Sequence, residues 1–217
     1  MQPETRQKII DSFMDLLGET AWESVTFERL AGRAGVPLSA LRGAYDTRVD
    51  IIADYARRID EGILDSTDPD MAKEGPRERL FDLLFSRLEA LSRHKRAIAN
   101  LGRAARRDPG LALALSRIAA ISMSWMLTAA GIRATGAQGM LRAQGLALVW
   151  SRVLRTWLHE DDPGLPQTMA QLDSQLRRAE RAALRLERLR RFVGGARGYP
   201  PETSPLAGSD LAEGHPS

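Results

Sequence analysis

The 217-residue sequence contains no cysteine, which excludes disulfide bonds, a thiol nucleophile and thiolate ligands for a metal. It also lacks a Ser/His/acid spacing, a P-loop and a dinucleotide-binding glycine pattern. Of its three histidines, His159 stands beside acidic residues 160–162, but consecutive side chains at a helix end point in different directions and do not form a metal site. We therefore predict that the protein is not an enzyme and binds neither a metal nor a cofactor.

Long apolar runs are also missing from the sequence. Arg or Gly interrupts the apolar stretches well before the roughly 18 residues that a membrane-spanning helix needs. No apolar segment follows residues 1–6, so a secretory signal peptide is not expected. Apolar residues make up 43% of the chain and charged residues 27%, as in a soluble globular protein. These features predict a cytoplasmic protein.

Positive charge is concentrated in the later part of the chain. Residues 1–60 contain eight Lys or Arg and ten Asp or Glu, whereas residues 75–192 contain 21 Lys or Arg and ten Asp or Glu. Two basic clusters stand out, one from Arg93 to Arg107 and one from Arg177 to Arg191. A solvated helix face explains such clusters most simply. The alternatives are contact of the first cluster with nucleic acid or with the acidic segment 61–74, and peripheral contact of the second with an anionic membrane surface.

The spacing of apolar residues predicts helices throughout. They recur every three or four positions, beginning with Ile9, Ile10 and Phe13, and no stretch alternates convincingly with a period of two. A last helix is expected from about Pro166 to Phe192, and its apolar positions alternate three and four apart, as in a helix-pairing seam. The predicted fold class is all-α.

Residues 26–44 predict a helix-turn-helix. Thr26 is a suitable N-cap for a short helix that Gly35 ends, and Pro37 can occupy the first turn of a second short helix that ends at about Ala44. In a helix-turn-helix the second helix enters the major groove of DNA, because a helix fits that groove and its first turns reach the base edges.

The segment from Arg6 to Tyr55 resembles the N-terminal domain of TetR-type transcriptional regulators. The resemblance lies in the stretch from Val25 to Ser39, with its capping Thr, Leu-Ala pair, Ala-Gly-Val turn and following short helix. It implies a homodimer that binds a pseudo-palindromic double-stranded DNA operator, acts as a repressor and is released by a small apolar ligand. It also implies a larger helical second domain that binds the ligand and dimerises. The implied boundaries are a helix-turn-helix domain at 1–48, a connecting helix and linker at 49–75, the second domain at 76–193 and a disordered tail at 194–217.

The resemblance implies a set of DNA-contacting residues. In this interpretation Thr26 caps its helix beside a phosphate, Ser39 and Arg42 contact bases, and Tyr45 and Arg48 hold the DNA backbone. The full set is Thr26, Arg29, Pro37, Leu38, Ser39, Arg42, Gly43, Tyr45 and Arg48. Leu38, Arg42 and Gly43 stand where the family usually has a basic or polar residue, a Tyr and a His. A protein that keeps the fold without binding DNA therefore remains an open alternative.

The second domain contains candidate residues for a ligand pocket. Met and Trp side chains adapt to irregular apolar ligands, although the same residues also form ordinary cores. The candidates are Met123, Trp125, Met126, Met140 and Trp150.

Candidate dimer-interface residues come from the predicted seam of the last helix and from one preceding tryptophan. They are Trp157, Met169, Leu172, Leu176, Ala179, Ala183 and Leu186.

A second and fainter resemblance suggests an alternative function. The segment Arg77–Leu80, Trp125 before residues 129–131, and the segment from Trp157 to Pro163 are similar to the TetR-fold accessory proteins of ubiquinone biosynthesis. Those proteins bind lipid and not DNA. The alternative is therefore a lipid- or isoprenoid-binding accessory protein.

Overall fold

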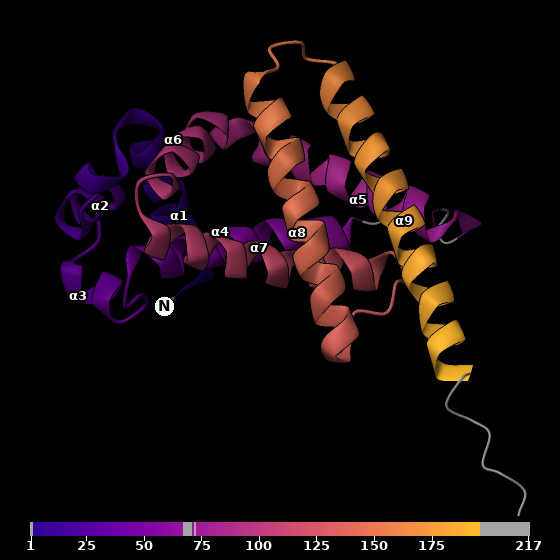
Figure 1. The fold of residues 1–217 in the computed structure, drawn as a ribbon. Helices are drawn as coiled ribbons and strands as arrows, with labels where there is room; N and C mark the ends of the chain where they lie inside the picture. Colours follow the sequence, from indigo (N-terminus) through magenta and orange to yellow (C-terminus); the bar gives the residue numbers. More distant parts are fainter. Residues whose placement is uncertain (1, 67–70, 72, 196–217) are drawn as a thin grey trace, which may run out of the picture. The chain divides into compact units, whose positions relative to one another are not determined.

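The structure, a computed structural model, describes residues 2–66, 71 and 73–195 of the chain, and side chains as far as Arg185. Residues up to Glu180 form one compact unit, and the rest of the last helix belongs to a separate unit. Every regular element in the described residues is a helix, so the predicted all-α class is confirmed (Figure 1). Most of the predicted tail, from residue 196 onward, and the side chain of Leu186 lie outside what the structure describes.

The described helices follow one another with short connections. Their order is α1 (Pro3–Glu19), η1 (Trp22–Ser24), α2 (Phe27–Ala34), α3 (Leu38–Arg42), α4 (Arg48–Asp65), α5 (Pro76–Leu91), η3 (Ser92–His94), α6 (Lys95–Ala105), α7 (Pro109–Ala129), α8 (Gly136–His159) and α9 (Pro166–Gly195).

Local sequence explains most helix ends. The Asp108 carboxylate caps α7 by accepting a hydrogen bond from the backbone N–H of Leu111, and Pro109 occupies the first turn, where its missing N–H costs nothing. α3 ends at Arg42, two residues before the predicted end, and Gly43 follows as its C-cap. α8 begins at Gly136 and contains further glycines at 139 and 145, which do not prevent a helix that is stabilised by packing.

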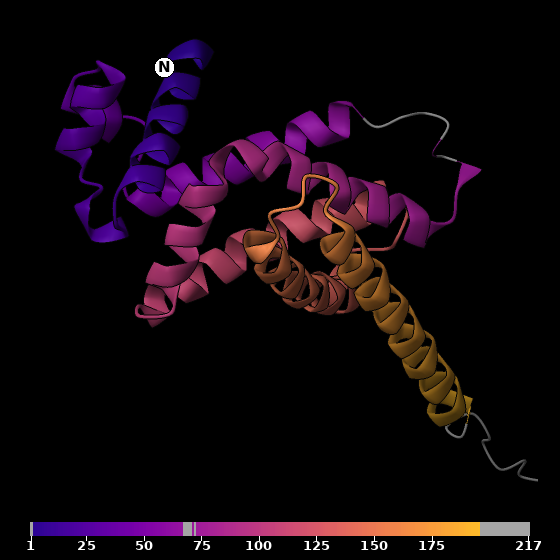
Figure 2. The same cartoon turned by 90° about the horizontal axis from the view of Figure 1, so that it is seen from above.

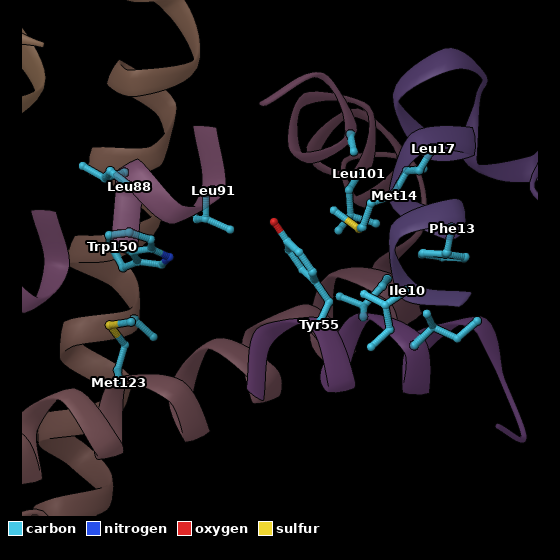
Figure 3. Packing of buried hydrophobic residues seen from close by; sticks show 14 of the residues in the cluster. Ile10, Phe13, Met14, Leu17, Tyr55, Leu88, Leu91, Leu101, Met123 and Trp150 are labelled. Atoms are coloured by element: carbon cyan, nitrogen blue, oxygen red, sulfur yellow. The ribbon is translucent and has the colours of Figure 1, made fainter. Parts of the chain in front are cut away.

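One continuous core joins the early and the late helices of the compact unit. α1 packs against α6, while α7 packs against α4 and α8. Figures 1 and 2 show α1, α2 and α3 grouped together, with α4 leading from them to the later helices. Figure 3 shows Tyr55 projecting from α4 between two apolar groups, one with Ile10, Met14 and Leu17 and the other with Leu88, Leu91 and Trp150. The Tyr55 hydroxyl lies 3.1 Å from Nδ1 of His94.

Among the described residues, one helix is long and apolar enough to span a membrane. This helix is α7, with a mean hydropathy of 1.5 over an 18-residue window that is 28% buried. Arg117 interrupts this apolar stretch as predicted, but it is the only charged residue between Pro109 and Ala129, and a single charge does not take the helix below this threshold of length and composition. Length and composition are weak evidence, since core helices of soluble proteins also pass this test. One face of α7 packs against α4 and α8, while Leu113, Ile121 and Trp125 elsewhere on the helix are exposed.

The start of α9 is held by a carboxylate that the sequence analysis did not single out. Glu160 accepts hydrogen bonds from the backbone N–H groups of Gln167 and Thr168 at 2.7 and 2.8 Å, and from the Thr168 hydroxyl at 2.5 Å. Lys95 Nζ donates to the Glu160 carbonyl oxygen at 2.5 Å. Burial alone would raise the pKa of Glu160, but these hydrogen bonds and the nearby Lys95 charge outweigh it and hold the pKa below its ordinary value.

We expect Glu160→Gln to lower the midpoint of thermal unfolding at neutral pH. The folded-state pKa lies below that of the unfolded chain, so the carboxylate stabilises the fold above the unfolded pKa and loses this effect as the pH falls through the folded pKa. The difference between variant and parent should therefore shrink in acid. Thermal unfolding across an acid-to-neutral pH series measures it, with Asp161→Asn as the exposed control. A difference that stays constant with pH would contradict the role of the charge.

Candidate nucleic-acid interface

The helix-turn-helix forms as the sequence predicts. The Thr26 hydroxyl accepts a hydrogen bond from the backbone N–H of Arg29 at 3.3 Å and caps α2. Gly35 follows α2 at φ 62°, a left-handed conformation that glycine adopts without steric cost. The backbone N–H of Val36 then donates to the Ala31 carbonyl, which closes the turn. Leu30 of α2 and Leu41 of α3 are buried together in the core, so their packing fixes the relative position of the two helices.

The outward face of α2 and α3 holds most of the predicted DNA-contacting residues. Seven of the nine are exposed on it: Thr26, Arg29, Pro37, Leu38, Ser39, Arg42 and Gly43. Leu38 is 48% exposed, whereas Leu41 of the same helix is buried. The Arg42 guanidinium pairs with Asp46 one turn later, but both side chains remain mostly exposed, so the pair can open at little cost. This face offers hydrogen-bond donors and one apolar side chain to a ligand.

Tyr45 does not lie on that face. It is 3% exposed, and its hydroxyl donates to Oδ2 of Asp54 at 2.7 Å. Burial is the main cause of a raised pKa of Tyr45, and the Asp54 carboxylate raises it further, to about 12. The expectation that Tyr45 holds the DNA backbone is corrected here, because its polar group is buried and already bonded. Tyr45 anchors the chain between α3 and α4.

Arg48 also has an internal role. Its Nη1 donates to the carbonyl oxygens of Trp22 and Val25 at 2.5 and 2.9 Å, and its guanidinium lies 4.1 Å from the centre of the Trp22 ring. Burial lowers the pKa of Arg48 from its ordinary value. Arg48 therefore ties the start of α4 to the segment that precedes α2, and the prediction of a backbone-holding role is corrected in the same way.

Asp54 is a buried carboxylate that links the helices behind this face. It accepts hydrogen bonds from Arg6 of α1, from Arg57 of its own helix and from Tyr45. Burial alone would raise the pKa of Asp54, but the hydrogen bonds from Arg6, Tyr45 and Arg57 outweigh it and hold the pKa below its ordinary value. Asp54 is not among the residues predicted from the sequence, because a charged residue within an amphipathic helix is expected on the solvent side. The cluster stabilises the position of the helix-turn-helix on α4.

The predicted ligand-pocket residues do not share one site. Met123, Met126 and Trp150 are buried in the core, whereas Trp125 and Met140 are 54% and 65% exposed. The reason is helical geometry, since Met123 and Met126 lie on the inner face of α7 and Trp125 lies on its outer face. Trp125 lines a groove of about 540 Å³ between α4 and α7, together with Ile121, Leu64 and the α4 carboxylates Asp54, Asp60 and Glu61.

The predicted dimer seam is divided between the core and the surface. Trp157, Leu172 and Leu176 are buried within the chain itself, which corrects their assignment to a contact between copies. Their spacing predicted a covered face, but spacing does not tell whether the cover comes from the same chain. Met169, Ala179 and Ala183 are exposed.

Solved structures of TetR-type regulators share this fold. A TetR transcriptional regulator from Nitrosomonas europaea ATCC 19718 is 18% identical, with a TM-score of 0.65 over 82% of this chain and 99% of the other. One from Rhodococcus sp. RHA1 is also 18% identical, with a TM-score of 0.57 over 81% and 96% of the two chains. A TetR-family transcriptional regulator from Streptomyces coelicolor is 15% identical, with a TM-score of 0.53 over 82% and 83%. No family model and no curated protein matches the sequence. The predicted TetR-type fold is therefore confirmed.

Proposed function

We propose that the protein is a sequence-specific DNA-binding transcriptional regulator that acts as a homodimeric repressor and responds to a small apolar ligand. The observation that carries the proposal is the exposed polar face of α3, which is held rigidly by the turn at Gly35 and by buried contacts of Leu41 and Tyr45. The shared fold with solved TetR-type regulators supports it.

In this proposal each part of the face has a role. Ser39 and Arg42 point away from the core on α3, and Arg42 can pair with two acceptors of a guanine. Leu38 can pack against a thymine methyl group. The N-terminus of α2, capped by Thr26 and followed by Arg29, is suited to a phosphate because its free N–H groups carry partial positive charge.

Selection of bound fragments from sheared genomic DNA of the source organism tests the proposal. Binding at two salt concentrations should recover a pseudo-palindrome, and its affinity should fall with salt because phosphate contacts release counterions. The logarithm of the affinity should fall only gradually with the logarithm of the salt concentration, because Arg6 and Arg48 bind groups inside the protein and do not contact phosphates. Recovery of no enriched sequence at either salt concentration would contradict the proposal.

For the homodimer, we propose that the outer face of α8 forms the contact. Met140, Leu141 and Leu148 are each more than half exposed on this helix, and Met169 at the start of α9 is partly exposed. Exposed apolar side chains at this density are typical of a surface that another protein covers. A two-fold contact would present two copies of α3 to successive turns of DNA.

We expect Leu148→Glu to convert the dimer to a monomer, because each two-fold contact would then bury two unpaired carboxylates. Sedimentation velocity measures the mass in solution. Leu113→Glu makes the same change at an exposed position of α7 and should leave the mass unchanged. If the parent protein is a monomer, or if Leu148→Glu stays dimeric, α8 is not the contact.

A specific observation favours the lipid-binding alternative as the second candidate. Leu113, Ile121 and Trp125 leave an apolar stripe exposed along α7, and Ile121 and Trp125 border the groove against α4. Both functions predict an apolar ligand, but only the alternative predicts that no DNA sequence is selected. Denaturing mass spectrometry of freshly purified protein, done beside the DNA selection, distinguishes them. A stoichiometric lipid without any selected DNA would favour the alternative.

A further inference from the structure

A second groove lies between the end of α1 and α6, away from the outward face of α3. It has a volume of about 580 Å³ and is lined by residues 18–23 on one side and by one face of α6 on the other. Pockets for small organic ligands have volumes in this range. Gly18 of α1 faces the start of α6, where a Cβ would lie 3.7 Å from the backbone nitrogen of Ala97, an ordinary van der Waals contact.

The α6 side of the groove carries three exposed guanidiniums. Arg96 and Arg103 lie seven residues apart on α6 and so share one face of the helix, Arg107 follows in the turn after Ala105, and all three line the groove. In the part of the chain that the structure describes, none of the three has a carboxylate within ion-pair distance. Three like charges along one wall of the groove repel each other, so an anion bound among them would relieve that repulsion.

The opposing wall adds little negative charge of its own. It contains Glu19 and Glu23. The Glu19 carboxylate is held by both Nη atoms of Arg33, at 2.5 and 2.8 Å, and this pairing is the largest cause of the lowered pKa of Glu19. Glu23 is then the one acid of the wall without an ion pair among the described residues. The groove is therefore positive overall.

One of the guanidiniums is positioned by a polar network. The Asn100 side-chain amide donates to the carbonyl oxygens of Leu17 and Thr20 at 2.7 and 3.2 Å, which fixes the side chain across the groove floor. Asn100 Oδ1 in turn accepts a hydrogen bond from Nη2 of Arg103. This network orients the Arg103 guanidinium without neutralising it, and leaves its other N–H donors for a ligand.

We propose that this groove binds a phosphorylated small molecule, with its phosphates on Arg96, Arg103 and Arg107 and its organic part against the alanines and Trp22 that complete the lining. Guanidiniums bind phosphate oxygens through paired N–H donors, which makes arginine the preferred residue for this task. The volume exceeds what inorganic phosphate fills and suits a molecule the size of a nucleoside diphosphate.

Isothermal titration calorimetry of the full chain without DNA tests the proposal. ADP is the probe, adenosine is the same molecule without phosphates, and inorganic pyrophosphate is the charge without the organic part. We expect one ADP per chain, weaker binding of pyrophosphate and none of adenosine. Arg103→Gln and Arg107→Gln should each weaken ADP binding about tenfold, since each removes charge-assisted hydrogen bonds. Arg178→Gln makes the same charge change at an exposed position of α9 and should leave binding unchanged.

Competition experiments distinguish a free phosphorylated molecule from the phosphates of a membrane or of DNA. Vesicles of phosphatidylglycerol should not compete with ADP if the ligand is a free molecule, and neither should a short DNA duplex that lacks the selected sequence. Competition by either one that Arg103→Gln abolishes would overturn the proposal in favour of a membrane or nucleic-acid surface. Absence of ADP binding to the parent protein, or equal weakening by Arg178→Gln, would also overturn it. None of these measurements depends on the DNA-binding function. The proposal for this groove and the proposal of DNA binding can therefore fail separately.

Discussion

Replacing Asp60 with Ala is expected to lower the free energy of unfolding by about 3–5 kcal/mol, because the substitution leaves a buried charge without its partner. Asp60 lies on α4 and is buried, and its Oδ1 accepts hydrogen bonds from Nη1 of Arg87 on α5 and from the Ser122 hydroxyl on α7. Burial lowers the pKa of Arg87 to about 10, which leaves it charged at neutral pH. Without Asp60, that buried guanidinium would lose its counterion.

Urea unfolding of matched variants measures this effect. Asp65→Ala removes the same charge at the exposed end of α4 and should change stability by less than about 0.5 kcal/mol. The double variant Asp60→Leu with Arg87→Met should recover most of the loss, because it removes both charges and fills the space with apolar atoms. If Asp60→Ala is no more destabilising than Asp65→Ala, the buried pair does not hold α4, α5 and α7 together.

Replacing Arg42 with Ala is expected to weaken binding to the selected operator by about 1–3 kcal/mol, or about 5- to 150-fold, and to relax the base preference at one position of each half-site. Arg42 is exposed at the end of α3, and its pairing with Asp46 leaves both side chains accessible. Its guanidinium lies on α3, where it can pair bidentately with a guanine. Fluorescence anisotropy with the operator and with single-base variants measures affinity and preference together.

The control for this experiment removes a positive charge elsewhere. Arg106 is exposed and directly follows α6, and Arg106→Ala changes the net charge by the same amount as Arg42→Ala. It should leave the base preference intact and alter the affinity far less than Arg42→Ala. Equal effects of the two variants would mean that Arg42 contributes only general attraction, and an unchanged base preference would remove it from direct contact with a base.

The helix-turn-helix could be predicted because its signals are local. Thr26 as an N-cap and Gly35 as a left-handed residue each depend on a few neighbouring residues, and the structure shows both. The exposed position of Leu38, Ser39 and Arg42 follows from the same short segment. Helical periodicity also predicted the all-α class, since it is preserved in any packing arrangement.

The buried polar contacts could not be predicted, because they join residues far apart in the chain. Tyr45 and Arg48 matched a family pattern by position, yet their side chains bind Asp54 and the carbonyl oxygens of Trp22 and Val25. Asp60 and Arg87 are 27 residues apart, and the sequence offers no sign that they meet. The apolar seam of α9 shows the same limit, since Leu172 and Leu176 are covered by their own chain. Spacing predicts which side of a helix is covered. Only the tertiary fold shows whether the same chain or a second copy covers it.

We expect two copies of α3 to contact DNA in successive turns of the major groove, which a hydroxyl-radical footprint on the recovered fragment would show. We predict two protected half-sites on one face of the duplex, with centres about 34–36 Å apart, both lost at the same protein concentration in the Arg42→Ala variant. A single protected site, protection without a repeat at the helical period, or a footprint that Arg42→Ala leaves unchanged would contradict the claim.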